Sequence, residues 1–298
     1  PVIEIMVDNP LINCDPAIAN GQLSATADGG QVGGYTFTWF EGATSGGVQV
    51  GDNNKLIGVD LDPSPDYTVV VVNNLTGCSS EETGTLTDGR ITPPVPTALL
   101  VKDNTSCITP NGWVSANVGG QTFNYTFLWY DGGVITNPTN YNFEGINYID
   151  RPKDTYAVTA TDQITGCVSP PATIAVEDRQ AFPELSLEST PSYCFDTGRP
   201  GQGTVLLNVV NSDVVTLDEM NWFDENDNQV GVGVQLLGLY PGVYRVEVVS
   251  SEGCPGEGQV EVKADILSYN LVSVNVDGRN DTWIIDCISL FPNNNVKV

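Results

Sequence analysis

The sequence YTFTWF at residues 35–40 decides how the chain is interpreted, because it returns as YTFLWY at residues 125–130. The two copies are 90 positions apart (125 minus 35), and a weaker third copy, MNWF, stands at residues 220–223. Each copy places a tryptophan among aromatic residues of high β propensity. A repeat of this length indicates tandem structural modules.

Three other landmarks recur in the same order around this strand. An early cysteine comes first, at Cys14, Cys107 and Cys194, and a strand of small residues follows an Asn-Gly or a Gly at residues 20–25, 111–116 and 203–207. After the aromatic strand comes a tyrosine-led strand that closes on Gly-Cys, at residues 67–78, 156–167 and 244–254. A period near 90 residues with several short strands is typical of an immunoglobulin-like sandwich. We therefore predict an all-β chain of tandem immunoglobulin-like β-sandwich modules.

The module boundaries follow from the repeat and from proline-rich or polar segments near residues 87–96, 179–183 and 263–265. They predict modules at 1–90 and 91–180, a divergent module at 181–265, and the first strands of a further β-sandwich domain at 266–298. The length of 298 residues fits two to four domains. No signal peptide opens the sequence and residues 1–5 already resemble a strand, so we expect a piece of a longer protein.

The tryptophan of each aromatic strand is expected to fill the space between two sheets. The alternative is a sugar-stacking platform, but recurrence at one structural position favours core packing for Trp39, Trp129 and Trp222. Trp113 lies outside the shared pattern and is the better candidate for an exposed ring, although we expect a structural role for it too. The tyrosines that open the closing strands follow turn-rich segments, which predicts tyrosine corners at Tyr67, Tyr156 and Tyr244.

The charge and the missing histidine exclude several classes of function. A formal net charge of -26 repels nucleic-acid phosphates and anionic lipid headgroups, so neither is expected as a partner. The sequence has no His, which removes Ser-His-Asp and Cys-His catalysis and imidazole metal ligands. No apolar run is long enough to span a bilayer. An enzyme is therefore the least expected class.

The seven cysteines indicate disulfides, because no CxxC pair and no histidine accompany them. They place the chain in an oxidising compartment, the periplasm or the cell exterior. The separation of the early and the closing cysteine is almost constant, which suggests one bridge within each module: Cys14–Cys78, Cys107–Cys167 and Cys194–Cys254. Six cysteines allow many connectivities, and Cys287 is left over.

The geometry of an immunoglobulin-like module leaves this pairing open. In the strict topology the A–B turn, near the early cysteine, and the F–G turn, with the closing Gly-Cys, lie at opposite ends of a module. A disulfide bridge needs Cα atoms within about 7 Å. The early cysteine would then have to belong to the first strand, or the topology would have to differ.

One acidic segment resembles a calcium loop. Its candidate ligands, all oxygen donors, are Asp224, Asn226, Asp227 and Asn228. The segment directly follows the third aromatic strand, so a hairpin turn is the plainer interpretation. No other metal and no cofactor is expected.

The run from a double glycine to the closing cysteine resembles the SprB repeat of Bacteroidetes surface proteins. In the first module the matching segments are 29–30, 35–39 and 67–78, and in the second they are 119–120, 125–129 and 156–167. The third module keeps only Trp222, Gly242, Tyr244, Gly253 and Cys254.

The end of the sequence is similar to the opening of the gliding motility-associated C-terminal domain, a sorting domain read by the type IX secretion system. The similarity covers about the first third of such a domain, and the proline usually found near its start is absent. The matching positions are Asn275, Asp277, Gly278, Asn280, Asp281, Trp283, Phe291, Pro292 and Asn294.

Together the two resemblances imply the C-terminal stalk and sorting region of a SprB-like gliding adhesin. They imply export through the periplasm to the cell surface, where the protein is outer-membrane associated. The expected partners are the gliding machinery and, for the C-terminal segment, the type IX translocon or an outer-membrane shuttle component of the PorV type. The alternatives are glycan-binding accessory modules of a secreted enzyme and a calcium-stiffened adhesion rod.

Overall fold

The computed structural model describes residues 1–194, 200–268, 285, 286 and 288. The regular secondary structure of the described chain is almost entirely antiparallel strand, with a short 3₁₀ helix, η1 (Pro16–Ile18). Among these residues no helix is long and apolar enough to cross a membrane.

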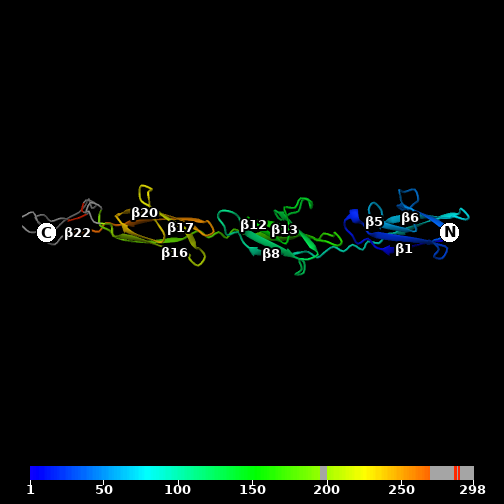
Figure 1. The fold of residues 1–298 in the computed structure, drawn as a ribbon, viewed down its shortest axis with the longest axis horizontal. Coiled ribbons are helices and arrows are strands. Elements are labelled where there is room, and N and C mark those ends of the chain that lie inside the picture. The colour runs from blue at the N-terminus through cyan, green and yellow to red at the C-terminus, as the bar shows by residue number, and fades with distance from the viewer. Residues whose placement is uncertain (195–199, 269–284, 287, 289–298) are drawn as a thin grey trace, which may run out of the picture. The chain divides into compact units, whose positions relative to one another are not determined.

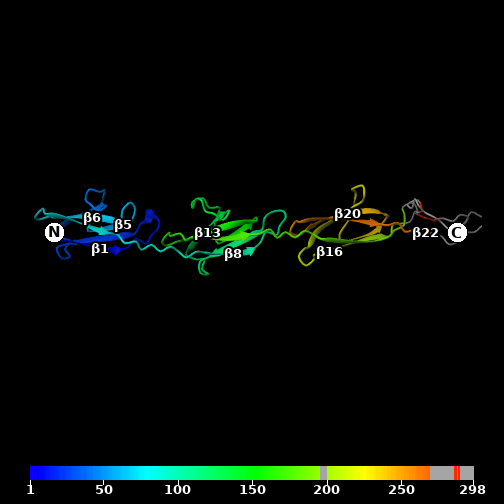
Figure 2. The ribbon, with the colours of Figure 1, turned by 180° about the vertical axis from the view of Figure 1, so that it is seen from behind.

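The first sandwich pairs a three-stranded with a four-stranded sheet (Figures 1 and 2). The three-stranded sheet has the order β1-β2-β5, and the four-stranded sheet has the order β4-β3-β6-β7. The predicted aromatic strand is β3, and the tyrosine-led strand is its neighbour β6. The bounds are β1 (Ile3–Asn9), β2 (Gly21–Ala27), β3 (Tyr35–Glu41), β4 (Gln49–Gly51), β5 (Lys55–Val59), β6 (Asp66–Asn73) and β7 (Ser79–Thr85).

The same strand order recurs in the next two sandwiches. In the second, the sheets are β8-β9-β12 and β11-β10-β13-β14, with β8 (Thr97–Lys102), β9 (Gly112–Asn117), β10 (Tyr125–Asp131), β11 (Phe143–Glu144), β12 (Asn147–Arg151), β13 (Asp154–Asp162) and β14 (Ala172–Val176). In the third they are β15-β16-β19 and β18-β17-β20-β21, with β15 (Leu185–Thr190), β16 (Gly203–Val209), β17 (Leu217–Phe223), β18 (Gln229–Val232), β19 (Gln235–Leu239), β20 (Gly242–Ser250) and β21 (Pro255–Val262). A short pair, β22 (Leu267–Ser268) with β23 (Ile285–Asp286), follows. The predicted all-β, immunoglobulin-like fold is confirmed.

Each sandwich has its own hydrophobic core around one tryptophan. Trp39, Trp129 and Trp222 are fully buried. Each indole Nε1 donates a hydrogen bond of 2.8 to 2.9 Å to a backbone carbonyl, at Asn53, Gly145 and Gly233 respectively. Burial with a satisfied indole N–H confirms core packing, and it rules out these three rings as sugar platforms.

The tyrosine corners are also confirmed. The hydroxyls of Tyr67, Tyr156 and Tyr244 donate to backbone carbonyls four to seven residues upstream, at distances of 2.6, 2.8 and 2.9 Å. Burial raises the pKa of all three phenols, because it penalises the phenolate. Each tyrosine thus fixes the turn that leads into β6, β13 or β20.

The chain divides into two compact units. The first contains Pro1–Lys102 and Trp113–Val176, and the second contains Asp103–Gly112 with the described part of Glu177–Val298. The loop between β8 and β9 therefore belongs with the third sandwich, although its flanking strands belong to the second. A disulfide in each unit explains this grouping, as described next.

Candidate functional site: disulfide junctions

The two disulfides that the described part of the chain contains in full join consecutive sandwiches and do not close any one of them. Cys14 is bonded to Cys167, and Cys107 is bonded to Cys254, with Cα–Cα distances of 4.8 and 5.0 Å. Cys78 is free and exposed. Cys194 is also disulfide-bonded. The expected pairings within modules, Cys14–Cys78, Cys107–Cys167 and Cys194–Cys254, are therefore wrong, and Cys287 lies outside the described residues.

The topology gives the physical reason for the correction. The loop after β1 lies at the downstream end of the first sandwich, because the Leu11 N–H donates to the Thr87 carbonyl just beyond β7. The Gly-Cys turn lies at the upstream end, because the Asn74 N–H donates to the Gly34 carbonyl just before β3. The two cysteines of one sandwich are thus at opposite ends, too far apart for a bridge. The downstream loop of one sandwich instead meets the upstream turn of the next.

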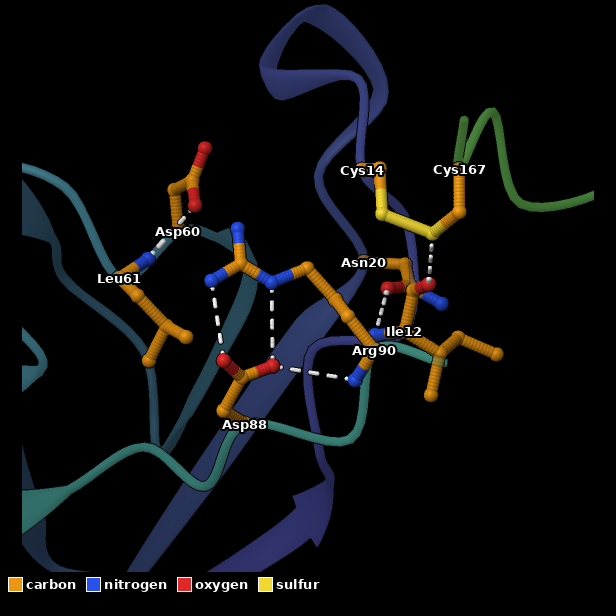
Figure 3. A network of polar contacts seen from close by, with 8 residues as sticks. All are labelled: Ile12, Cys14, Asn20, Asp60, Leu61, Asp88, Arg90 and Cys167. Carbon is orange, nitrogen blue, oxygen red and sulfur yellow. Dashed lines mark hydrogen bonds and ion pairs between the residues drawn. A yellow bond between two sulfur atoms is a disulfide. The ribbon is translucent and has the colours of Figure 1, made fainter. Parts of the chain in front are cut away.

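We call the downstream loop that carries Cys14 or Cys107 the donor loop, and the upstream turn that carries Cys167 or Cys254 the receiving turn. In each donor loop an asparagine side chain binds the two residues that precede the cysteine. In the first loop the Asn20 Oδ1 accepts a hydrogen bond from the Ile12 N–H at 3.0 Å (Figure 3). It accepts a second one from the Asn13 N–H at 3.1 Å. In the second loop the Asn111 Oδ1 accepts from the Thr105 and Ser106 N–H groups, at 2.8 and 3.3 Å. In both loops the two tied residues directly precede the bridging cysteine. The sequence contains this signal as Asn-Gly, but that dipeptide by itself predicts only the start of a strand.

A glycine shapes each receiving turn. Gly166 and Gly253 have φ values of +70° and +75°, the left-handed region that glycine enters without steric cost. The turn is closed by backbone hydrogen bonds on both sides of the glycine, such as Gly166 N–H to the Asp162 carbonyl and Asp162 N–H to the Cys167 carbonyl. A Cβ atom on Gly253 would also lie 2.3 Å from Ile108 Cγ1 of the donor loop. The glycine therefore allows both the turn and the close approach of the loop.

Each bridge is reinforced by a backbone hydrogen bond beside it. The Cys14 N–H donates to the Thr165 carbonyl at 2.7 Å, and the Cys107 N–H donates to the Glu252 carbonyl at 2.9 Å. The receiving cysteines, Cys167 and Cys254, are 1% and 0% exposed. Burial hides these sulfurs from an attacking thiolate, so the arrangement suits permanent structural bridges rather than redox exchange.

An ion pair lies beside each junction. In the first, Arg90 donates two hydrogen bonds to the Asp88 carboxylate, at 3.0 and 2.9 Å, which lowers the pKa of that carboxyl (Figure 3). In the second, the Asp103 carboxylate accepts from the Glu177 N–H and from Arg179, and these two bonds lower its pKa. The arginine of each pair is exposed to solvent, although the Asp103 side chain is only 13% exposed, so the pairs guide the chain path and add little stability.

The calcium candidates form a hairpin turn between β17 and β18. The Asp224 Oδ1 accepts from the Asn226 and Asn228 N–H groups, both at 2.9 Å, and the Asn228 side chain chiefly lowers the Asp224 pKa. Asp227 pairs with Arg245 at 3.0 Å. The turn interpretation is confirmed. Within the described ranges, no group of three His, Cys, Asp or Glu side chains could hold a metal ion.

Two predicted sites remain, the exposed-ring candidate Trp113 and the C-terminal sorting motif. Trp113, on β9, is 37% exposed, and its indole N–H donates to the Asn147 Oδ1 at 3.3 Å. The sorting-motif positions, from Asn275 and Asp277 to Pro292 and Asn294, lie outside the described residues.

No protein-family model matches the sequence, and a comparison with curated proteins also finds no match. Solved structures of other multi-module proteins do align with it. The three N-terminal domains of the outer capsid protein Hoc of bacteriophage RB49 align at 12% identity over 89% of this chain and 96% of that one, with a TM-score of 0.30. Chicken CNTN1 domains FN1–FN3 align at 14% identity over 87% and 98%, with a TM-score of 0.22. Fibronectin(III)-like modules of CbhA from Clostridium thermocellum align at 13% identity over 59% and 95%, with a TM-score of 0.24.

Proposed function

We propose that the chain is the C-terminal stalk and sorting region of a cell-surface gliding adhesin that the type IX secretion system exports. The observation that supports a stalk is the pair of disulfides between consecutive sandwiches. In a tandem protein held only by peptide linkers, a pull on the ends passes through every sandwich in series. Here the bridges Cys14–Cys167 and Cys107–Cys254 overlap in sequence, so the load between them is shared. A tether between a cell and a surface benefits directly from such load sharing.

The covalent topology shows how the load divides. Four half-cystines, at positions 14, 107, 167 and 254, define three chain segments: 14–107, 107–167 and 167–254. Each segment runs between the same two bridges, so the three act in parallel. The shortest of them, from Cys107 to Cys167, limits how far the whole region can extend. Once this segment is fully extended, the two longer segments still have slack and cannot be pulled straight.

The disulfides suggest an extracellular or secreted protein, and the acidic surface suits a crowded cell exterior. The route to the exterior is proposed from the C-terminal sequence. Its segment at residues 275–294 would be bound by the type IX translocon or by a PorV-type shuttle in the outer membrane, with strand-edge pairing as the simplest mode. In this proposal the chain is not an enzyme, and the gliding machinery is the further partner.

The two alternative functions have lost much of their support. Glycan-binding modules would need exposed aromatic platforms, and the three recurrent tryptophans are buried, whereas Trp113, which lies outside the shared pattern, is 37% exposed. A calcium-stiffened rod would need free oxygen ligands, and Asp224 and Asp227 are occupied by hydrogen bonds within the turn and by Arg245. Overlapping disulfides supply stiffening without a metal.

Deletion of residues 268–298 from the full-length parent protein tests the sorting role. We expect the truncated protein to accumulate inside the cell, whereas the Cys14→Ser/Cys167→Ser variant, with an intact C-terminal segment, reaches the surface. Surface labelling and fractionation measure both. Normal surface display of the truncated protein would overturn the proposal.

A further inference from the structure

Cys78 stands in a turn that has the local structure of the receiving turn at Cys167. The Asn73 N–H donates to the Cys78 carbonyl at 2.9 Å, as the Asp162 N–H does to the Cys167 carbonyl. Gly77 has a φ of +70°, the same value as Gly166. The Cys78 N–H is bonded to the Thr76 hydroxyl, which repeats the bond at Cys167. The turn is thus built for a junction before any partner is present.

The Cys78 turn differs from the two receiving turns because no loop in the described part of the chain covers its cysteine. Cys78 is exposed, whereas Cys167 and Cys254 are buried beneath the loops to which they are bonded. A Cβ atom on Gly77 would have no neighbour within 4 Å, whereas one on Gly166 would lie 3.4 Å from the Asp15 Cβ. The two occupied turns are an independent observation of what such a turn receives: a loop cysteine whose N–H also bonds the carbonyl two residues before the receiving cysteine.

We propose that Cys78 is the receiving half of a third junction. Its partner is the loop cysteine of a sandwich of the same kind that stands before residue 1 in the polypeptide. The direction follows from the two observed junctions, since each runs from the downstream loop of one sandwich to the upstream turn of the sandwich that follows it. The equivalent acceptor for the loop N–H is the Thr76 carbonyl, and Gly77 leaves room for the loop backbone.

The bond forms by thiol–disulfide exchange with an oxidised protein dithiol of the secretory compartment. The Cys78 thiolate attacks one sulfur of the oxidant disulfide and releases the other sulfur as a thiolate, which leaves a mixed disulfide. The partner thiolate then attacks the Cys78 sulfur and releases the second oxidant sulfur. Two thiols are oxidised to one disulfide, and the oxidant disulfide is reduced to two thiols, which take up the two protons that the oxidised thiols give up.

A tandem chain tests the proposal, with a second copy of residues 1–96 placed directly before Pro1 of the full chain. The added copy carries Cys78→Ser, so that only one cysteine of this position is present. Both proteins are refolded in a glutathione redox buffer, digested without reduction and analysed by mass spectrometry. A maleimide label applied before digestion reports any free thiol. In the unextended chain we expect Cys78 to be labelled.

In the tandem chain we expect Cys78 to lose its label and to appear in a peptide bonded to Cys14 of the added copy. The matched control is Cys78→Ser/Ser79→Cys in the full-chain part, which moves the thiol by one residue, out of the turn and into β7, where we expect no bond. The Cys14–Cys167 bond of the full-chain part reports correct folding in the same digest. A labelled Cys78 in the tandem chain, a bond to glutathione, a bond between two Cys78 residues of separate chains, or equal bonding of the shifted cysteine would each overturn the proposal.

Discussion

Mechanical extension tests the overlapping disulfides most directly. The pull is applied to the two ends of the full chain in an optical trap, in a Cys78→Ser/Cys194→Ser background that keeps only Cys14–Cys167 and Cys107–Cys254. The three segments between these bridges act in parallel, so the region from 14 to 254 extends only as far as its shortest segment, 107–167. At about 3.5 Å per residue, the 60 positions of this segment (167 minus 107) reach about 210 Å.

Removal of one bridge or both gives distinct lengths. With Cys14→Ser/Cys167→Ser added, the load follows 14–107 and then the remaining bridge, so 93 positions (107 minus 14) reach about 330 Å. With dithiothreitol, all 240 positions (254 minus 14) extend to about 840 Å. Bridges within modules predict a different value for the background chain, because only Cys107–Cys167 would remain and 180 positions (240 minus 60) would extend to about 630 Å. This longer extension, if measured without reductant, would refute the crossed pairing.

Three further predictions concern single side chains. Gly253→Ala should destabilise the Cys107–Cys254 junction by about 1 kcal/mol more than Gly77→Ala destabilises the first sandwich. Both substitutions strain a backbone with positive φ, but only the new methyl group at position 253 meets Ile108. Denaturant titration of each variant measures the difference, and equal costs would contradict the prediction. Tyr156→Phe should destabilise the second sandwich by about 1 kcal/mol, because the hydrogen bond from the Tyr156 hydroxyl to the Pro152 carbonyl is lost. Faster amide hydrogen exchange in β13 measures this loss, and unchanged exchange would contradict the stabilising role of the tyrosine corner. Burial raises the Tyr156 pKa, so the folded chain holds the phenol proton more tightly than the unfolded chain does. The contribution of the protonated phenol to folding stability is therefore complete below about pH 10 and is lost as the pH rises further. Above that pH the wild type should lose stability more steeply than Tyr156→Phe, and parallel curves of stability against pH would contradict this.

The sequence predicted those features that depend on one sandwich alone. A buried ring on a central strand and a hydroxyl that reaches back to its own turn are local consequences of the strand pattern, so the roles of Trp129 and Tyr156 follow from that pattern. The disulfide pairing depends on two sandwiches together. Constant spacing could not decide it, because a repeat makes the separation constant within modules and also between them: 153 for Cys14–Cys167 and 147 for Cys107–Cys254.

The deciding information was nevertheless present in the topology. Opposite ends for the two turns of one sandwich already excluded a bridge between them, and the same fact brings a downstream loop to the next upstream turn. The residues that shape the donor loop were harder to recognise. Asn20 acts through its side-chain oxygen on two N–H groups several residues earlier, a contact that no periodic pattern predicts.

The overlapping bridges and the open cysteine lead to one view of the stalk. Bridges that did not overlap in sequence would leave a peptide linker to carry the whole load between the end of one bridge and the start of the next. Because each donor loop precedes its own sandwich's turn in sequence, successive bridges overlap over the whole segment from Cys107 to Cys167, and no peptide linker between them carries the load alone. A bond at Cys78 would extend this overlap by the segment from Cys14 to Cys78, so that the first sandwich would also lie between two bridges. The mechanical continuity of a longer stalk then depends on the same loop and turn at every step, which is why a single unpaired Cys78 marks where the next junction belongs.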